Sequence, residues 1–143
     1  MMKKTIQSSV SLLLAFLFVL CLASCGNRVD VTGLWENATY KKDTELGKGS
    51  KTFTLEVTVE EQTVTLTVNT DAKTVGAALL ELELIDGDEG DFGLYIKKVN
   101  GMTADYDTDK SYWAFYINGE YAMTGVDGTD IEEGAIYRLA REQ

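Results

Sequence analysis

Alternating aspartates in residues 105–109 (Asp-Tyr-Asp-Thr-Asp) are the first candidates for chemistry. Their carboxylates stand at the first, third and fifth positions of a loop, as in loops that wrap a calcium ion. The pattern then departs from a calcium loop, because Lys110 replaces the turn glycine and Tyr116 replaces the bidentate glutamate. A second acidic stretch, residues 86–91, matches the ligand spacing of a calcium loop even less well. We therefore interpret both stretches as solvated surface and predict no metal site.

Nucleophilic and general-base side chains are scarce in this chain. It contains no histidine, and its two cysteines, Cys21 and Cys25, both lie near the N-terminus. Catalytic Ser-His-Asp and Cys-His sites and the usual zinc sites are thereby excluded. The carboxylates crowd into loops without the apolar surroundings that raise the pKa of a catalytic acid. We expect a protein that is not an enzyme and has no cofactor, with hydrolysis by paired carboxylates as the residual alternative.

Aromatic residues fill both faces of the predicted strand 112–117 (Tyr-Trp-Ala-Phe-Tyr-Ile). Because side chains alternate along a strand, a core position for Trp113 places Tyr112 and Tyr116 on the opposite face. Tyr121 and Met123, one hairpin turn later, could add to that second face. Tyrosines offer rigid area and a hydroxyl, so this face could be a platform for a flat ligand. Alternatively, the tyrosines cover the sheet or pack under the preceding segment.

The elements that position these aromatics are predicted from hydrophobic periodicity. Residues 53–59 and 64–68 alternate apolar and polar side chains on either side of a short connection, which indicates a β-hairpin. Thr74 can cap a helix whose apolar positions recur at three- and four-residue spacing and which ends near residues 86–87. One amphipathic helix therefore follows the hairpin.

Several short strands are predicted after the helix, bounded by turn residues: 94–99, 112–117, 121–123 and 135–140. The dipeptide Asn118-Gly119 predicts a tight hairpin turn between the second and third of them. One helix against one mixed sheet indicates an α+β fold, specifically a β-grasp-like roll.

The N-terminal segment has the layout of an export signal. Lys3 and Lys4 precede an apolar run, residues 10–22, which is short for a membrane-spanning helix. The run ends in Leu-Ala-Ser-Cys at residues 22–25, which resembles the lipobox of bacterial lipoproteins. We expect Cys25 to carry the lipid that anchors the protein to the membrane. The alternative is an ordinary signal peptide with an incidental cysteine.

Three segments are expected: a signal peptide (1–24), a lipid-anchored flexible tether (25–51) and one folded domain (52–143). Loss of the signal peptide takes the formal charge from −10 to −12, because it contains two lysines and no acid. Such a charge disfavours nucleic acid and direct contact with anionic lipid headgroups. The covalent lipid is then the expected membrane attachment. Part of the tether, residues 34–40, has apolar side chains that could dock on the domain.

The domain resembles a known family in several short motifs. It is similar to the bacterial relatives of the transcobalamin and intrinsic-factor C-terminal domain, a domain of unknown function in bacteria. The resemblance covers roughly residues 52–143. Its motifs are Tyr112-Trp113-Ala-Phe115-Tyr116-Ile-Asn118-Gly119, Gly125-Val126-Asp127, Ile131-Glu-Glu-Gly134-Ala-Ile136-Tyr137, Lys73-Thr74-Val75 with Leu79-Leu80, and Tyr95 to Val99 with Asn100-Gly101.

The resemblance implies a β-grasp-like fold and a role in holding a corrinoid such as cobalamin. It implies ligand contacts by the aromatic strand and by the Gly-Val turn. The full predicted ligand-binding set is Tyr112, Trp113, Tyr116, Asn118, Gly119, Tyr121, Gly125 and Val126. The functional expectation is a surface-anchored, extracytoplasmic ligand-binding lipoprotein, with capture of a corrinoid. The alternative is a structural or protein-interaction module at the cell surface.

Overall fold

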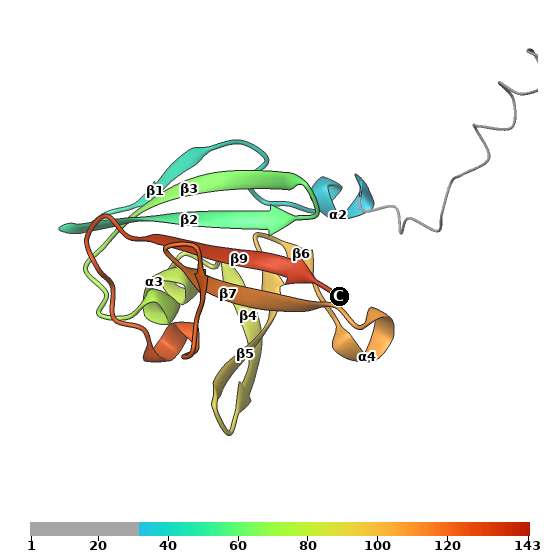
Figure 1. Ribbon diagram of the computed structural model, residues 1–143. Coiled ribbons are helices and arrows are strands. Elements are labelled where there is room, and N and C mark those ends of the chain that lie inside the picture. Colours follow the sequence, from blue (N-terminus) through green and yellow to red (C-terminus); the bar gives the residue numbers. More distant parts are fainter. Residues whose placement is uncertain (1–31) are drawn as a thin grey trace, which may run out of the picture. The chain divides into compact units, whose positions relative to one another are not determined.

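The computed structural model describes residues 32–143 (Figure 1). The predicted signal peptide, Cys25 and the start of the predicted tether lie outside these residues. Within the described part, the elements in chain order are α2 (Thr32–Glu36), β1 (Thr44–Gly47), β2 (Lys51–Val59), β3 (Gln62–Thr70), α3 (Val75–Glu81), β4 (Ile85–Gly90), β5 (Gly93–Val99), β6 (Met102–Thr103), α4 (Tyr106–Asp109), β7 (Tyr112–Ile117), β8 (Glu120–Tyr121), the 3₁₀ helix η1 (Val126–Gly128) and β9 (Ile136–Glu142).

The predicted fold class is wrong, because the protein is mostly β. Strands make up 49% and helices 16% of the structure, so it is not an α+β roll built around one amphipathic helix. A mixed sheet is present, with the strand order β1-β3-β2-β9-β7-β8, and a second sheet has the order β4-β5-β6. The second sheet was not expected, since β4 (Asp-Gly-Asp-Glu-Gly after Ile85) lacks the alternation of a half-buried strand.

The predicted hairpin of β2 and β3 is confirmed and supplies much of the core. Both strands are nine residues long and pair antiparallel, with Leu55 opposite Leu66. The inward residues of β2 are at most 1% exposed, and those of β3 at most 6%. Strand β9 runs parallel to β2 and brings Tyr137 beside Leu55. Each such buried side chain stabilises the fold by about 1.5–3 kcal/mol.

The predicted capped helix is present but short. The Thr74 hydroxyl accepts a hydrogen bond from the Ala77 N–H at 3.2 Å, and Val75, Ala78 and Leu79 face the core. Helix α3 ends at Glu81, so the following residues are free to form β4. Figure 1 shows α3 beside the β4–β5 hairpin, which extends away from the large sheet.

Residues 32–51 differ from the flexible tether that the sequence predicts. Strand β1 pairs parallel with β3, and Leu34, Trp35 and Tyr40 pack against the core. Asn100, 1% exposed, holds this segment in place. Its side chain accepts from the Tyr40 N–H and donates to the Tyr40 carbonyl, each at 2.8 Å. Of the residues that the structure describes, none belongs to a helix long and apolar enough to cross a membrane.

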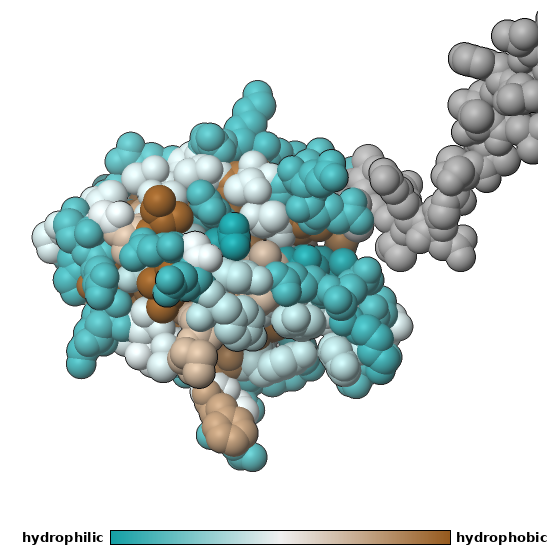
Figure 2. All heavy atoms as spheres, in the orientation of Figure 1, coloured by the Kyte–Doolittle hydropathy of each residue, from teal (hydrophilic) through white to brown (hydrophobic). Residues whose placement is uncertain are grey.

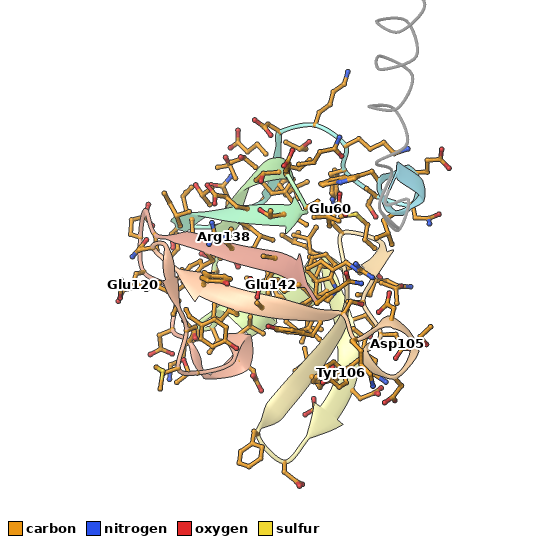
Figure 3. The ribbon with its side chains drawn as sticks, turned by 45° about the vertical axis from the view of Figure 1, so that its right-hand side comes forward. Glu60, Asp105, Tyr106, Glu120, Arg138 and Glu142 are labelled. Carbon is orange, nitrogen blue, oxygen red and sulfur yellow. The ribbon has the colours of Figure 1, made fainter. Side chains whose placement is uncertain are left out.

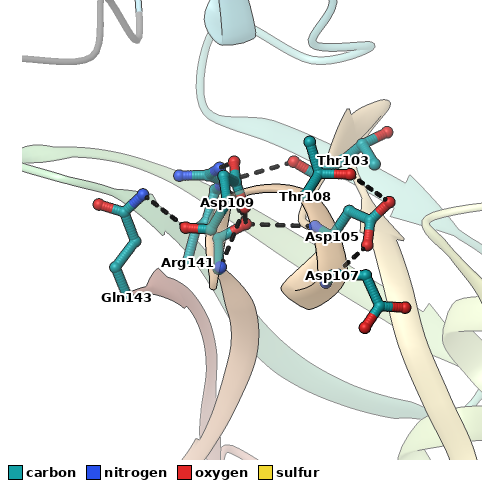
Figure 4. A network of polar contacts seen from close by, with 8 residues as sticks. Thr103, Asp105, Asp107, Thr108, Asp109, Arg141 and Gln143 are labelled. Atoms are coloured by element: carbon teal, nitrogen blue, oxygen red, sulfur yellow. Dashed lines mark hydrogen bonds and ion pairs between the residues drawn. The ribbon is translucent and has the colours of Figure 1, made fainter.

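The acidic run 105–109 forms the short helix α4, where its carboxylates make internal contacts (Figure 4). Asp105 caps the helix by accepting from the Asp107 N–H at 3.0 Å. Asp109 accepts from the Ser111 hydroxyl and pairs with the Arg141 guanidinium at 2.6 Å. Arg141, whose side chain is only 6% exposed, also donates to the Thr103 carbonyl at 3.3 Å. The network ties α4 to the end of β9.

Asp109→Asn is expected to reduce the acid sensitivity of the fold. The Ser111 hydroxyl, and to a lesser degree Arg141, hold the pKa of Asp109 below its ordinary value of 3.8. The stabilisation by the ionised carboxylate is therefore complete above that value and is lost as the pH falls through the lower folded-state pKa. We expect a cost near neutral pH of about 1–2 kcal/mol, because water screens the partly exposed pair. Urea unfolding between neutral pH and pH 2 should show a shallower acid decline in the variant; parallel declines would contradict this role.

Candidate functional site

Strand β7 presents its aromatics on two faces, as the alternation predicts. Trp113 and Phe115 are 8% and 9% exposed and belong to the core, whereas Tyr112 and Tyr116 are half-buried on the other face. Trp113, a member of the predicted ligand-binding set, thus lies within the hydrophobic core. Tyr121 on β8 pairs with Tyr116, and their rings meet edge to face at 5.5 Å. We call Tyr112, Tyr116 and Tyr121 the tyrosine face.

Two hydroxyls of the tyrosine face, those of Tyr112 and Tyr116, share one internal partner, Glu142. Tyr112 donates to one carboxylate oxygen of Glu142 at 3.2 Å, and Tyr116 donates to the other. These hydrogen bonds to Glu142 raise the pKa of both tyrosines above the ordinary value. The Arg138 guanidinium lies 4.4 Å from the centre of the Tyr116 ring. Figure 3 labels Arg138 and Glu142, both on β9. Two of the three tyrosine hydroxyls are therefore already paired with Glu142, whereas Tyr121 is 62% exposed.

The predicted Asn118-Gly119 turn is confirmed between β7 and β8. Both residues have positive φ, 48° and 87°, which suits this dipeptide in a two-residue hairpin turn. The Asn118 side chain accepts from the Ile136 N–H at 2.9 Å and so joins the turn to β9. These contacts give the two residues a structural role.

The loop after β8 and the tip of the β4–β5 hairpin flank an open surface cavity of about 580 Å³. We call it the loop cavity; it is lined by Phe92, Met123, Thr124, Gly125, Asp127 and Gly128. Phe92 is 100% exposed and Met123 is 95% exposed, so both apolar side chains extend fully into solvent. Figure 2 shows apolar surface reaching over the end of the β4–β5 hairpin. Such exposed apolar side chains beside a cavity are typical of binding surfaces.

The two walls of the loop cavity are joined by Asp127. Its carboxylate accepts from the Leu94 N–H at 3.2 Å and so links η1 to the start of β5. Gly93 has φ of +102°, and a Cβ there would lie 2.5 Å from the Asp127 carboxylate. On the other side, a Cβ on Gly76 of α3 would lie 2.9 Å from the Asp127 backbone. Glycines at both contacts let the walls approach closely, so the cavity is held in shape before any ligand arrives.

The structure brings together only part of the predicted ligand-binding set. Gly125 lines the loop cavity, whereas Val126 beside it is 1% exposed and anchors η1 in the core. The residues of the tyrosine face are not among the lining residues. Sequence reasoning missed Phe92 and Asp127 as site residues, and it assigned Met123 to the second face of the aromatic strand, whereas Met123 lines the loop cavity. The available signal for Phe92 was its position between Asp91 and Gly93. A phenylalanine in a turn cannot pack into the core, so it is a candidate for binding a ligand or partner.

The chemistry available at the loop cavity is binding. One carboxylate, two apolar side chains, a hydroxyl and glycine backbone line it. Across residues 32–143, no group of three or more His, Cys, Asp or Glu side chains is placed to hold a metal ion. The carboxylate of Asp127 is already an acceptor for a backbone N–H. The arrangement suits an amphiphilic ligand with a broad apolar edge.

Comparison with known proteins identifies relatives of the domain. Residues 72–135 match the family model described as a domain of unknown function, DUF4430. A crystal structure of a "putative metal binding protein" from Ruminococcus gnavus is 30% identical, with a TM-score of 0.62, over 66% of this chain and 98% of that one. Haptocorrin in complex with Cbi is 18% identical, with a TM-score of 0.53, and the match covers 68% of this chain and 26% of the haptocorrin chain. No curated protein sequence matches.

Proposed function

The chain belongs to the same family as the Ruminococcus gnavus protein, and from that premise we propose that it is a non-enzymatic corrinoid-binding protein of the cell envelope. In this proposal the loop cavity takes the ligand and a lipid on Cys25 holds the protein on the outer side of the bacterial membrane. The shared fold with haptocorrin, a protein solved in complex with Cbi, supports the ligand class.

The observation that carries the proposal is that two exposed apolar side chains, Phe92 and Met123, both line the loop cavity. Both side chains are almost fully exposed, although exposed apolar groups of this size are costly in water. A corrinoid is a broad, flat ring with an apolar rim and amide side arms. Its rim can cover Phe92 and Met123, and its amides can bond the glycine-rich backbone from Gly125 to Gly128 and the Thr124 hydroxyl.

The charge of the protein supports a lipid anchor in preference to direct adsorption. With 23 acidic and 13 basic residues, the chain is repelled by anionic headgroups. A covalent lipid attaches it without requiring a basic surface. The exposed apolar pair then remains available for a ligand from outside the cell.

A protein-docking role is the second candidate, favoured by the same exposed pair. Large apolar side chains at loop tips can anchor a partner protein, and the acidity would steer a basic partner toward them. In that case the loop cavity would be part of a protein interface and would not take a corrinoid.

Calorimetric titration of the purified protein with cobalamin and cobinamide tests the proposal. We expect saturable binding at micromolar ligand or tighter, accompanied by a rise in melting temperature at excess ligand. Riboflavin, a flat molecule without the macrocycle, serves as the control and should give neither effect. Absence of heat together with an unchanged melting temperature for both corrinoids would refute corrinoid binding and favour the docking role.

A further inference from the structure

A second cavity, separate from the loop cavity, lies where the N-terminal segment meets the start of β3. It has a volume of about 330 Å³ and is lined by Trp35, Lys41, Gln62, Thr63 and Val64. We call it the Trp35 cavity. The two cavities have no lining residue in common, so a ligand of the Trp35 cavity would bind independently of the corrinoid.

The Trp35 cavity is rich in hydrogen-bond donors and has no acidic lining residue. Lys41 makes no ion pair with any residue that the structure describes. The Trp35 indole N–H is inaccessible to solvent and has no acceptor among the described residues, so Trp35 offers a ligand its ring and not this donor. Gln62 adds an amide. No carboxylate is among the lining residues, and the nearby Asp43 carboxylate is already bonded to the Thr65 N–H at 2.9 Å. A ligand that fits it should bring acceptors and a negative charge.

The apolar part of the Trp35 cavity is firmly supported. Val64 is 6% exposed and belongs to the core, and Trp35 packs against that core. Asn100 fixes the chain at Tyr40, between Trp35 and Lys41, through two hydrogen bonds of 2.8 Å. The backbone between the indole and the lysine is therefore fixed, which limits the backbone ordering that binding requires, while the Lys41 side chain is exposed.

We propose that the Trp35 cavity binds a pyranose sugar that carries a carboxylate. The C–H face of the sugar ring stacks on the Trp35 indole, the carboxylate pairs with the Lys41 ammonium, and the hydroxyls bond Gln62. The volume is near the lower end of ligand sites, about 300–1,000 Å³, which suits one or two sugar rings. Two sources present this chemistry: muramic acid whose carboxylate has been released from the peptide stem of the bacterial cell wall, and the uronic acids of other polysaccharides.

Amide and indole NMR spectra of the ¹⁵N-labelled protein test the proposal with named sugars. Glucuronate and N-acetylmuramate should shift the Trp35 indole and Gln62 side-chain signals in a saturable manner, in the millimolar range. Trp113, 8% exposed in the core, supplies the internal reference and should not move. Glucose and N-acetylglucosamine should bind at least tenfold more weakly than their acidic counterparts. Tighter binding of N-acetylmuramate assigns the site to peptide-free fragments of cell wall, and tighter binding of glucuronate assigns it to other polysaccharides.

Two neighbouring lysines provide matched variants. Lys41→Gln should abolish the preference for acidic over neutral sugars, whereas Lys42→Gln, at an exposed position that does not line the cavity, should leave it intact. Unchanged spectra elsewhere confirm that both variants fold. Equal effects of the two substitutions, equal binding of neutral and acidic sugars, or benzoate binding as tightly as glucuronate would overturn the proposal.

Discussion

Replacing Phe92 and Met123 together by serine is expected to weaken corrinoid binding by about 100-fold or more. Each side chain contributes about 1.5–3 kcal/mol when a ligand covers it, and about 1.4 kcal/mol corresponds to a tenfold change in affinity. The free energy of unfolding should change by less than about 0.5 kcal/mol, because both side chains are almost fully exposed and contribute little to the core. Calorimetry measures the affinity and urea unfolding measures the stability.

A matched control separates this effect from a general loss of surface aromatics. Tyr106 on α4 is 51% exposed and does not line the loop cavity, so Tyr106→Ser should bind corrinoid normally. Tyr121→Ser tests the tyrosine face, where Tyr121 is 62% exposed. If Tyr121→Ser lost binding and the Phe92/Met123 variant retained it, the ligand would lie on the tyrosine face and the assignment to the loop cavity would be wrong.

The elements that the sequence predicts well are those set by short-range rules. Alternation in β2 and β3 shows which side is buried, because one face of each strand meets the core and the other meets solvent. The Thr74 cap and the Asn118-Gly119 turn are likewise decided by residues within a few positions. The folded protein keeps these local structures because no long-range contact competes with them.

The fold class was missed because two strands carry no such signal. Strand β4 is acidic and glycine-rich, and beyond Ile85 its residues are mainly solvent-exposed, so neither face shows apolar alternation. Strand β1 is four residues long and joins the sheet edge in parallel with β3. The pairing of β2 with β9 joins residues about 80 positions apart, for example Leu55 and Tyr137. Strand order across such separations cannot be obtained from local periodicity.

The residues of the candidate site also fall into two groups: those that local patterns predict and those whose role depends on long-range pairing. Gly125 was found through a motif, and the division of β7 into two faces followed from alternation. The contribution of Phe92 depends on the β4–β5 hairpin, which was not predicted, and on the contact between Asp127 and Leu94, 33 residues apart. The engagement of both tyrosine hydroxyls by Glu142 likewise depends on the pairing of β7 with β9. Long-range pairing therefore determines which predicted residues remain free to meet a ligand.

Replacing Asn100 by alanine is expected to lower the free energy of unfolding by about 4 kcal/mol. The substitution leaves the partly buried N–H and carbonyl of Tyr40 without their protein partners, at about 1–3 kcal/mol each. It also places alanine at a φ of 51°, which asparagine tolerates better. Urea unfolding measures the loss, and NMR should show that the Trp35 indole signal shifts, because the chain between Trp35 and Lys41 is released.

Asn118→Ala is the matched control for this prediction, because Asn118 has a similar φ of 48° but is exposed. It makes one side-chain hydrogen bond, to the Ile136 N–H, and water can replace that partner. We therefore expect a loss of only about 1–2 kcal/mol. Equal losses in the two variants would mean that positive φ, and not the Tyr40 contact, dominates at Asn100. A larger loss at Asn100 would establish that residues 32–40 are stabilised as part of the folded domain.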